Sequence, residues 1–273
     1  TTASANAMAV SGSEQAWLKA MLLSLLKICL MAYFGLGVYL YLAQRSFMYF
    51  PVAENPARDA SFEFFTHDGE SLKVWVVGRG TDRAAIYFGG NAEDVYYNAD
   101  GFRSALPNHT VYLVNYRGYG GSSGSPTEAG LFADALGLYD ALREKHSQIA
   151  VVGRSLGTGV ATYLASERTV HRLVLATPHD SAVAVAQGMY PVYPVSLLLK
   201  DRYDSVAYAP KIQTPTLIVV AEHDRIIPRK HSDRLAEAFS PGLVEQVVVS
   251  GAGHNGLSGH QQYWDEFGRF LNP

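Results

Sequence analysis

Ser155 is the residue in this sequence best placed to do chemistry, because it lies in the pentapeptide 153–157 with a glycine at each end. The apolar run 149–152 before it predicts a buried strand, and the small residues after it predict a helix packed close to a sheet. So sharp a strand-to-helix turn strains the serine backbone, and the glycines leave room for it. We expect an exposed hydroxyl beside the free backbone N–H of Leu156, ready for acyl-transfer chemistry.

A serine hydroxyl is a poor nucleophile unless a base lies within hydrogen-bond reach and an acid orients that base. His254 follows the last predicted strand, 245–249, and Asp224 follows the apolar strand 216–220. Serine, aspartate and histidine at successive strand ends, in this order, are typical of a triad on a parallel sheet. The sequence therefore predicts Ser155 as nucleophile, Asp224 as acid and His254 as base.

Other residues compete for these roles, and the pentapeptide alone also fits a packed turn. Glu222 lies two residues before Asp224, and His223 and His260 are alternatives to the predicted base. The C-terminal part of the chain also has four histidines that could be read as metal ligands: His223, His231, His254 and His260. Zinc sites use histidine pairs at close helical spacing, and no two of these four have that spacing. We therefore expect no metal site and no cofactor.

A second donor for developing negative charge is expected after the predicted strand 84–88. Gly89 and Gly90 let the backbone approach a substrate carbonyl closely. The backbone N–H of Asn91 then becomes the natural partner of the Leu156 N–H in an oxyanion hole.

Apolar strands alternate with helical patterns along most of the chain, which predicts a mostly parallel sheet covered by helices on both faces. The expected strands are 61–66, 72–77, 84–88, 111–116, 149–152, 173–176, 216–220 and 245–249. Residues 178–211, rich in proline and apolar side chains, interrupt the alternation. They predict either a small lid over the carboxyl edge of the sheet or one packed helix with a loop.

An apolar stretch near the N-terminus, residues 18–43, has the length of ~20 residues that a membrane-spanning helix needs. We predict a single membrane-anchor helix over residues 14–45, in contact with lipid through 18–43. Residues 1–13 look like a disordered or artificially added leader. The stretch is too long for a cleaved signal peptide and no small-residue cleavage site follows it.

The polar residues in the first turns of this helix keep an in-plane, interfacial arrangement open as the alternative to a spanning helix. Lys19 and Lys27 lie in the first part of the apolar stretch, and Arg45 lies just after it. This distribution favours a cytoplasmic N-terminus and an external catalytic domain.

The composition fits one large α/β core, since 48% of the 273 residues are hydrophobic and the net charge is only −3. Lysine and arginine nowhere form a basic block, so no nucleic-acid partner is expected. The single cysteine, Cys29, excludes a disulfide framework within the chain.

Five motifs in order resemble the α/β-hydrolase superfamily, and more narrowly its membrane-anchored Bem46-like branch. They are residues 153–157, 90–92, 115–126, the Asp224 loop and 253–255. The resemblance implies an α/β fold with a mostly parallel sheet of about eight strands, a small lid and a catalytic domain over 46–273. It also implies the roles already given to Ser155, Asp224, His254, Asn91 and Leu156. The family usually has histidine where this chain has Gly89.

The predicted function is that of a membrane-tethered serine hydrolase acting on carboxylic esters or thioesters, with acyl or lipid-like substrates. A peptidase or amidase of the same fold is one alternative, and a non-catalytic membrane-bound binding module is another. The pattern indicates no oligomeric state.

Overall fold

The computed structural model describes residues 12–54 and 61–272. Most of the predicted leader, residues 1–11, therefore lies outside the described residues. Contacts divide the chain into an N-terminal unit, Thr1–Gln44, and a globular unit, Arg45–Pro273.

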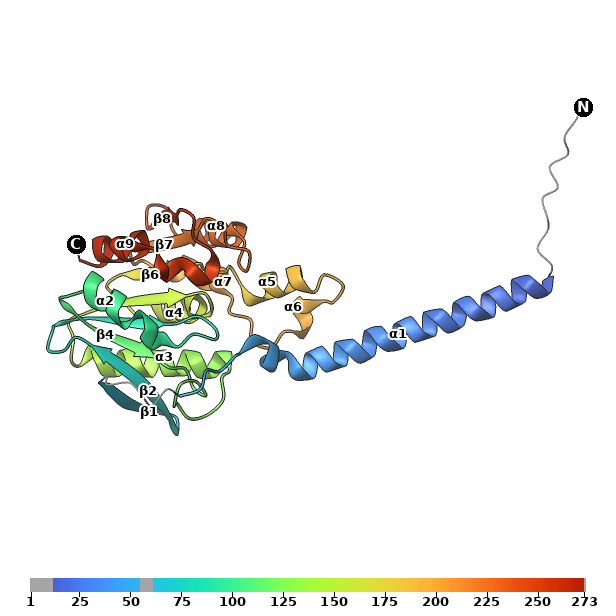
Figure 1. The fold of residues 1–273 in the computed structure, drawn as a ribbon, viewed down its shortest axis with the longest axis horizontal. Helices are drawn as coiled ribbons and strands as arrows, with labels where there is room; N and C mark the ends of the chain where they lie inside the picture. Colours follow the sequence, from blue (N-terminus) through green and yellow to red (C-terminus); the bar gives the residue numbers. More distant parts are fainter. Residues whose placement is uncertain (1–11, 55–60, 273) are drawn as a thin grey trace, which may run out of the picture. The chain divides into compact units, whose positions relative to one another are not determined.

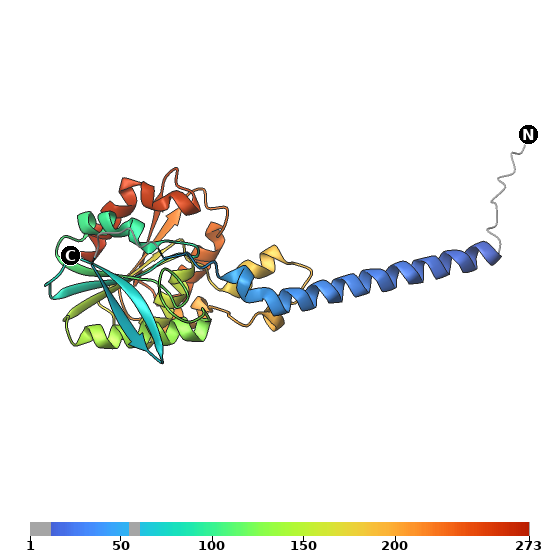
Figure 2. The same cartoon turned by 60° about the horizontal axis from the view of Figure 1, so that its bottom comes forward.

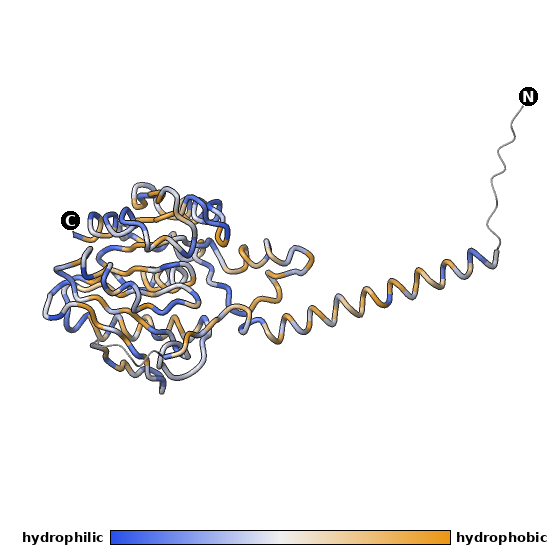
Figure 3. Tube along the Cα trace, viewed as in Figure 1, coloured by the Kyte–Doolittle hydropathy of each residue, from blue (hydrophilic) through white to orange (hydrophobic). Residues whose placement is uncertain are grey.

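The described residues of the N-terminal unit all belong to the helix α1 (Gly12–Met48), whose last turn continues into the globular unit. Its 37 residues correspond to about 55 Å, more than the ~30 Å of a bilayer core. Figure 3 shows apolar residues along most of its length. Among the described residues it is the one helix long and apolar enough to cross a membrane, and its apolar window is not buried by the rest of the protein. α1 is therefore a candidate membrane anchor.

The globular unit is built on an eight-stranded sheet with the order β1-β2-β4-β3-β5-β6-β7-β8 (Figure 1). Strands β3 to β8 run parallel to one another, whereas β2 is antiparallel to both β1 and β4. This confirms the predicted α/β-hydrolase fold class. The strands are β1 (Phe62–His67), β2 (Glu70–Val77), β3 (Arg83–Phe88), β4 (His109–Val114), β5 (Gln148–Arg154), β6 (Leu173–Ala176), β7 (Thr216–Ala221) and β8 (Val244–Val249).

The turn between β1 and β2 has a clear local cause. His67 pairs with Glu70, so only Asp68 and Gly69 lie between the strands. Both turn residues have positive φ, +47° and +78°. Two consecutive left-handed residues form the tight turn that matches the twist of a hairpin, and an Asp-Gly pair favours it.

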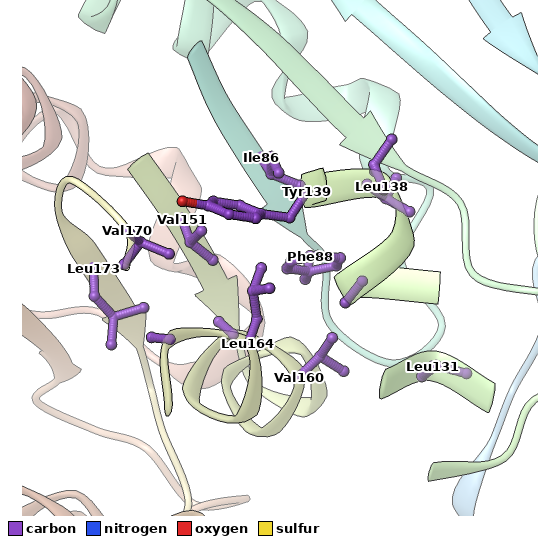
Figure 4. Close-up of a cluster of buried hydrophobic side chains, with 14 of the residues drawn as sticks. Ile86, Phe88, Leu131, Leu138, Tyr139, Val151, Val160, Leu164, Val170 and Leu173 are labelled. Carbon is purple, nitrogen blue, oxygen red and sulfur yellow. The ribbon is translucent and has the colours of Figure 1, made fainter. Parts of the chain in front are cut away.

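Helices cover both faces of the sheet (Figure 2). Residues of α3, α4 and α8 share one buried cluster with the strands, and residues of α2 and α9 share another. Figure 4 shows the first cluster, where Phe88 and Val151 of the strands lie with Tyr139 of α3 and with Val160 and Leu164 of α4. The helices are α2 (Ala99–Ala105), α3 (Glu128–Arg143), α4 (Leu156–Glu167), α8 (Arg229–Ala238) and α9 (Gln261–Leu271), with 3-10 turns at Val95–Asn98 and His254–Gly259.

Residues 178–211 form short helices joined by irregular chain, not one packed helix. They are α5 (Ala182–Met189), α6 (Val195–Leu198), α7 (Ser205–Tyr208) and a 3-10 turn at Ala209–Lys211. The backbone N–H of Ala182 donates to the carbonyl of Arg202 at 2.9 Å, so the segment leaves and returns at one place. We call residues 182–202 the apolar hairpin. In Figure 1 its helices α5 and α6 project beyond the ends of the strands.

Candidate active site

Ser155 lies between β5 and α4 with φ +49° and ψ −115°, a backbone conformation that L-residues rarely adopt. The neighbouring glycines are required by close backbone contacts. A Cβ on Gly157 would lie 2.0 Å from the carbonyl oxygen of Phe88, and one on Gly153 would lie 2.5 Å from the carbonyl oxygen of Gly157. The strained turn thus depends on the absence of side chains at both glycines.

Ser155, His254 and Asp224 lie together at the carboxyl edge of the sheet. The Oγ of Ser155 is 2.9 Å from Nε2 of His254, and Nδ1 of His254 is 2.7 Å from Oδ2 of Asp224. The other oxygen of Asp224 accepts from the backbone N–H groups of Ile226 and Ile227, at 2.9 and 2.8 Å. Since Nδ1–H donates to the buried carboxylate, Nε2 can accept the serine proton.

The competing residues lie outside this hydrogen-bond chain. Glu222 accepts from the Oγ of Ser250 and the N–H of Gly251, at 2.8 and 2.7 Å. His223 is exposed, and His260 directly precedes α9, at its N-cap position. In the described part of the chain, no group of three or more acidic, histidine or cysteine side chains is arranged to hold a metal ion.

The loop after β3 presents the second predicted donor. The Asn91 side chain is occupied by the protein, because Nδ2 donates to the carbonyl of Met48 at 2.7 Å and Oδ1 accepts from the N–H of Phe50 at 2.9 Å and from Tyr119 Oη at 2.9 Å. The backbone N–H groups of Asn91 and Leu156 have no hydrogen-bond partner among the described residues. The absence of a protein acceptor for either N–H group is consistent with the predicted oxyanion hole.

The structure explains why this chain has glycine at position 89, where the family usually has histidine. A Cβ at this position would lie 2.5 Å from Cγ1 of Val95, so the space that a histidine would need is filled. The Gly89 carbonyl instead accepts a 2.7 Å hydrogen bond from the buried hydroxyl of Tyr116. Tyr116 thus holds the loop through a backbone carbonyl.

A buried ion pair, Glu93 with Arg154, was not predicted from the sequence. Nη1 of Arg154 donates to Oε2 of Glu93 at 2.7 Å, and both side chains are only 10% exposed. The same carboxylate oxygen accepts from the N–H of Gly90, and Nη2 of Arg154 donates to the carbonyl of His254 at 3.0 Å. The pair therefore connects the oxyanion loop, the residue before Ser155 and the backbone of the predicted base.

The second oxygen of Glu93 accepts from Tyr87 Oη at 2.6 Å and from Nδ2 of Asn98. Burial acts to lower the pKa of Arg154, but the charge and hydrogen bond of Glu93, together with Tyr87 and Tyr263, outweigh burial and raise that pKa above its ordinary value. The charge of Arg154 is thus retained inside the protein. Arg154, a charged residue within the pentapeptide 153–157, could have indicated an ion pair at this site, but its partner Glu93 lies far away in the sequence.

His179 follows β6 and lies next to the same edge. It is buried, and burial lowers the pKa of its imidazole to about 4. Its Nδ1 is 3.4 Å from Oγ1 of Thr158, which in turn donates to the carbonyl of Ser155 at 2.6 Å. A neutral imidazole therefore supports the turn that carries the serine.

Comparison with known proteins gives the family. Residues 86–204 match the family model described as the alpha/beta hydrolase fold. An uncharacterised protein of Mycobacterium tuberculosis is 35% identical over 241 residues, which cover 81% of this chain and 84% of the relative. The chain belongs to the α/β-hydrolase family.

Further relatives agree with this assignment and with the Bem46-like branch. The human alpha/beta hydrolase domain-containing protein 17C is 28% identical, over 85% of this chain and 71% of its own length. The enol-lactonase of Burkholderia xenovorans has a similar fold, with a TM-score of 0.62 at 16% identity over 77% of this chain and all of the lactonase. An esterase of Pyrococcus furiosus also has a TM-score of 0.62, at 18% identity over 82% of this chain and 98% of its own. Membership of this α/β-hydrolase family supports a hydrolase.

Proposed function

We propose that the protein is a membrane-anchored serine hydrolase that cleaves carboxylic esters or thioesters of acyl or lipid-like substrates through an acyl-enzyme. The observation that carries the proposal is the hydrogen-bond chain from Ser155 Oγ to His254 and on to Asp224, with distances of 2.9 and 2.7 Å. Such a chain gives a serine both a base and an orienting acid.

The reaction begins when Ser155 Oγ attacks the substrate carbonyl carbon and His254 Nε2 takes the hydroxyl proton. The negative charge that develops on the carbonyl oxygen is stabilised by the N–H groups of Leu156 and Asn91, which cost no reorganisation because the backbone already holds them. Asp224 stabilises the imidazolium without itself taking the proton.

The tetrahedral intermediate collapses when the bond to the leaving alcohol or thiol breaks and His254 returns the proton to that group. A water molecule then attacks the acyl-Ser155 ester while His254 takes one of its protons. The bond between the acyl group and Oγ breaks, His254 returns the proton to Ser155 Oγ, and the acid is released. No step needs a metal or an organic cofactor.

α1 supplies the proposed anchor. The positions of Lys19, Lys27 and Arg45 favour a cytoplasmic N-terminus, with the catalytic domain of residues 46–273 outside. A reporter active on only one side of the membrane, fused after Pro273, tests this arrangement. Reporter activity on the cytoplasmic side would contradict it.

Hydrolysis of p-nitrophenyl esters from acetate to palmitate, in detergent, tests the chemistry. Ser155→Ala should abolish turnover on every chain length, whereas Ser166→Ala, at a half-buried serine near the other end of α4, should leave it unchanged. The chain length at maximal rate measures the acyl pocket. A thioester series with the same acyl groups then distinguishes esterase from thioesterase.

Two results would overturn the proposal in different ways. Cleavage of aminoacyl amides with weak ester turnover, both dependent on Ser155, would assign a peptidase. Absence of turnover together with failure of a serine-reactive phosphonate to label Ser155 would assign a binding protein.

A further inference from the structure

The apolar hairpin has a composition that is unusual for a protein surface. Residues 181–199 contain no charged side chain, and no acidic residue occurs between Asp180 and Asp201. Lys200 and Arg202, both exposed, follow directly. The hairpin is therefore an apolar tip with basic residues at its base.

The structure leaves this tip largely uncovered. None of the residues of α5 is buried, although its sequence is alanine, valine and methionine with one glutamine and one glycine. Met189 and Leu197 are 59% and 82% exposed, and Tyr190 is also exposed. A helix that is apolar on all sides normally lies inside a protein or in contact with lipid.

The base of the hairpin is fixed to the segment that enters the globular unit. Nε of Arg45 donates to Oδ2 of the buried Asp201 at 2.9 Å. The hydroxyls of Tyr49 and Tyr203, both buried, lie 2.8 Å apart. Arg45 also closes the apolar stretch of the proposed anchor, so the base of the hairpin is bound to the residue that follows this stretch.

The same end of the globular unit carries the reacting serine. The hairpin departs after β6, at the carboxyl edge of the sheet, and Ser155 follows β5 at that edge. Figure 1 shows α5 and α6 extending from this edge. A surface that contacts lipid through the hairpin would bring the serine near lipid as well.

We propose that the apolar hairpin is a second membrane contact. Met189, Tyr190 and Leu197 enter the boundary between headgroups and acyl chains, and Lys200 and Arg202 lie among anionic headgroups. The carboxyl edge of the sheet then faces the bilayer, and the acyl substrates reach Ser155 from the membrane. This last step rests on the proposed function, whereas the lipid contact itself does not.

Lipid contact is measured with the full chain in vesicles of phosphatidylcholine and phosphatidylglycerol. In a Cys29→Ser background, Met189→Cys carries an environment-sensitive fluorophore, and Phe64→Cys serves as the control because Phe64 on β1 is equally exposed, at 58%. We expect blue-shifted emission and quenching by doxyl lipids at position 189 and neither at position 64. A fluorophore at 189 that stays in water overturns the proposal. Emission that shifts with protein density but resists doxyl lipids also overturns it, in favour of contact between two copies.

The functional consequence is measured as a ratio. Met189→Glu should lower turnover of a vesicle-embedded ester relative to a soluble ester about tenfold, the effect expected from losing one buried apolar side chain, whereas Phe64→Glu should not change this ratio. An unchanged ratio for Met189→Glu contradicts presentation of substrate from the bilayer. If no variant hydrolyses the soluble ester, the proposed function fails, and the fluorescence result still decides the lipid contact.

Discussion

Replacing Glu93 by glutamine tests whether the buried ion pair holds the active site together. Each oxygen of the Glu93 carboxylate accepts two donors, from Tyr87 and Asn98 on one side and from Gly90 and Arg154 on the other. A glutamine offers one oxygen and one NH2 group. The NH2 group then faces either the Gly90 N–H and Arg154, which can only donate, or the Tyr87 hydroxyl and Asn98, of which the hydroxyl can turn to accept.

The larger cost comes from Arg154, which keeps its charge in a site with only 10% exposure. Removing one member of a buried ion pair costs roughly 3–5 kcal/mol of unfolding free energy, because the other charge is left without its partner. For a domain of this size, that corresponds to a fall of about 6–20 °C in Tm. Loss of the Gly90 anchor should also loosen the oxyanion loop and lower kcat about tenfold, part of the effect of losing one oxyanion donor.

Thermal unfolding and steady-state kinetics on a p-nitrophenyl ester give both quantities. The double variant Glu93→Gln with Arg154→Met should recover much of the lost stability, because no buried charge remains, and the cycle should show strong coupling. A Tm within about 2 °C of the native protein for Glu93→Gln, a shift of less than about 1 kcal/mol, would refute the energetic reasoning. A lowered Tm with unchanged kcat would refute the role in positioning the oxyanion loop.

Three further substitutions are informative. Gly157→Ala places a Cβ 2.0 Å from a backbone carbonyl oxygen and should abolish ester turnover and lower Tm, whereas Gly259→Ala meets open space and should do neither; equal effects would contradict the packing argument. Asp224→Asn should reduce kcat by about 10³–10⁴, whereas Glu222→Gln should change it little; the reverse order would reassign the acid. The pKa of His179 is about 4 in the folded state against 6.5 for the free side chain, so the unfolded state binds more protons between these values and stability falls as the pH is lowered through this window. His179→Asn should remove about 2 kcal/mol of the loss between pH 7 and 5 in urea unfolding, and an unchanged pH dependence would contradict this.

The sequence alone was sufficient for the fold class and for the order of the candidate catalytic residues. Buried strands and amphipathic helices are encoded in runs of neighbouring residues, so the strand at residues 173–176 was predicted with the bounds that β6 has in the structure. The role of the glycines around Ser155 could be predicted for the same reason, since the turn that they permit is local. Because the carboxyl ends of parallel strands meet at one edge, the positions of Asp224 and His254 after their strands also implied proximity.

Tertiary structure decided what depends on residues far apart in the chain. Glu93 and Arg154 are 61 residues apart, and the Asn91 side chain is bound by the carbonyl of Met48, 43 residues before it. No periodicity identifies such pairs, because the partner of a buried charge is chosen by packing rather than by spacing. The same holds for the apolar hairpin, since the composition of residues 182–202 fits a packed helix as well as an uncovered one. Only the fold determines which of its side chains remain without protein neighbours.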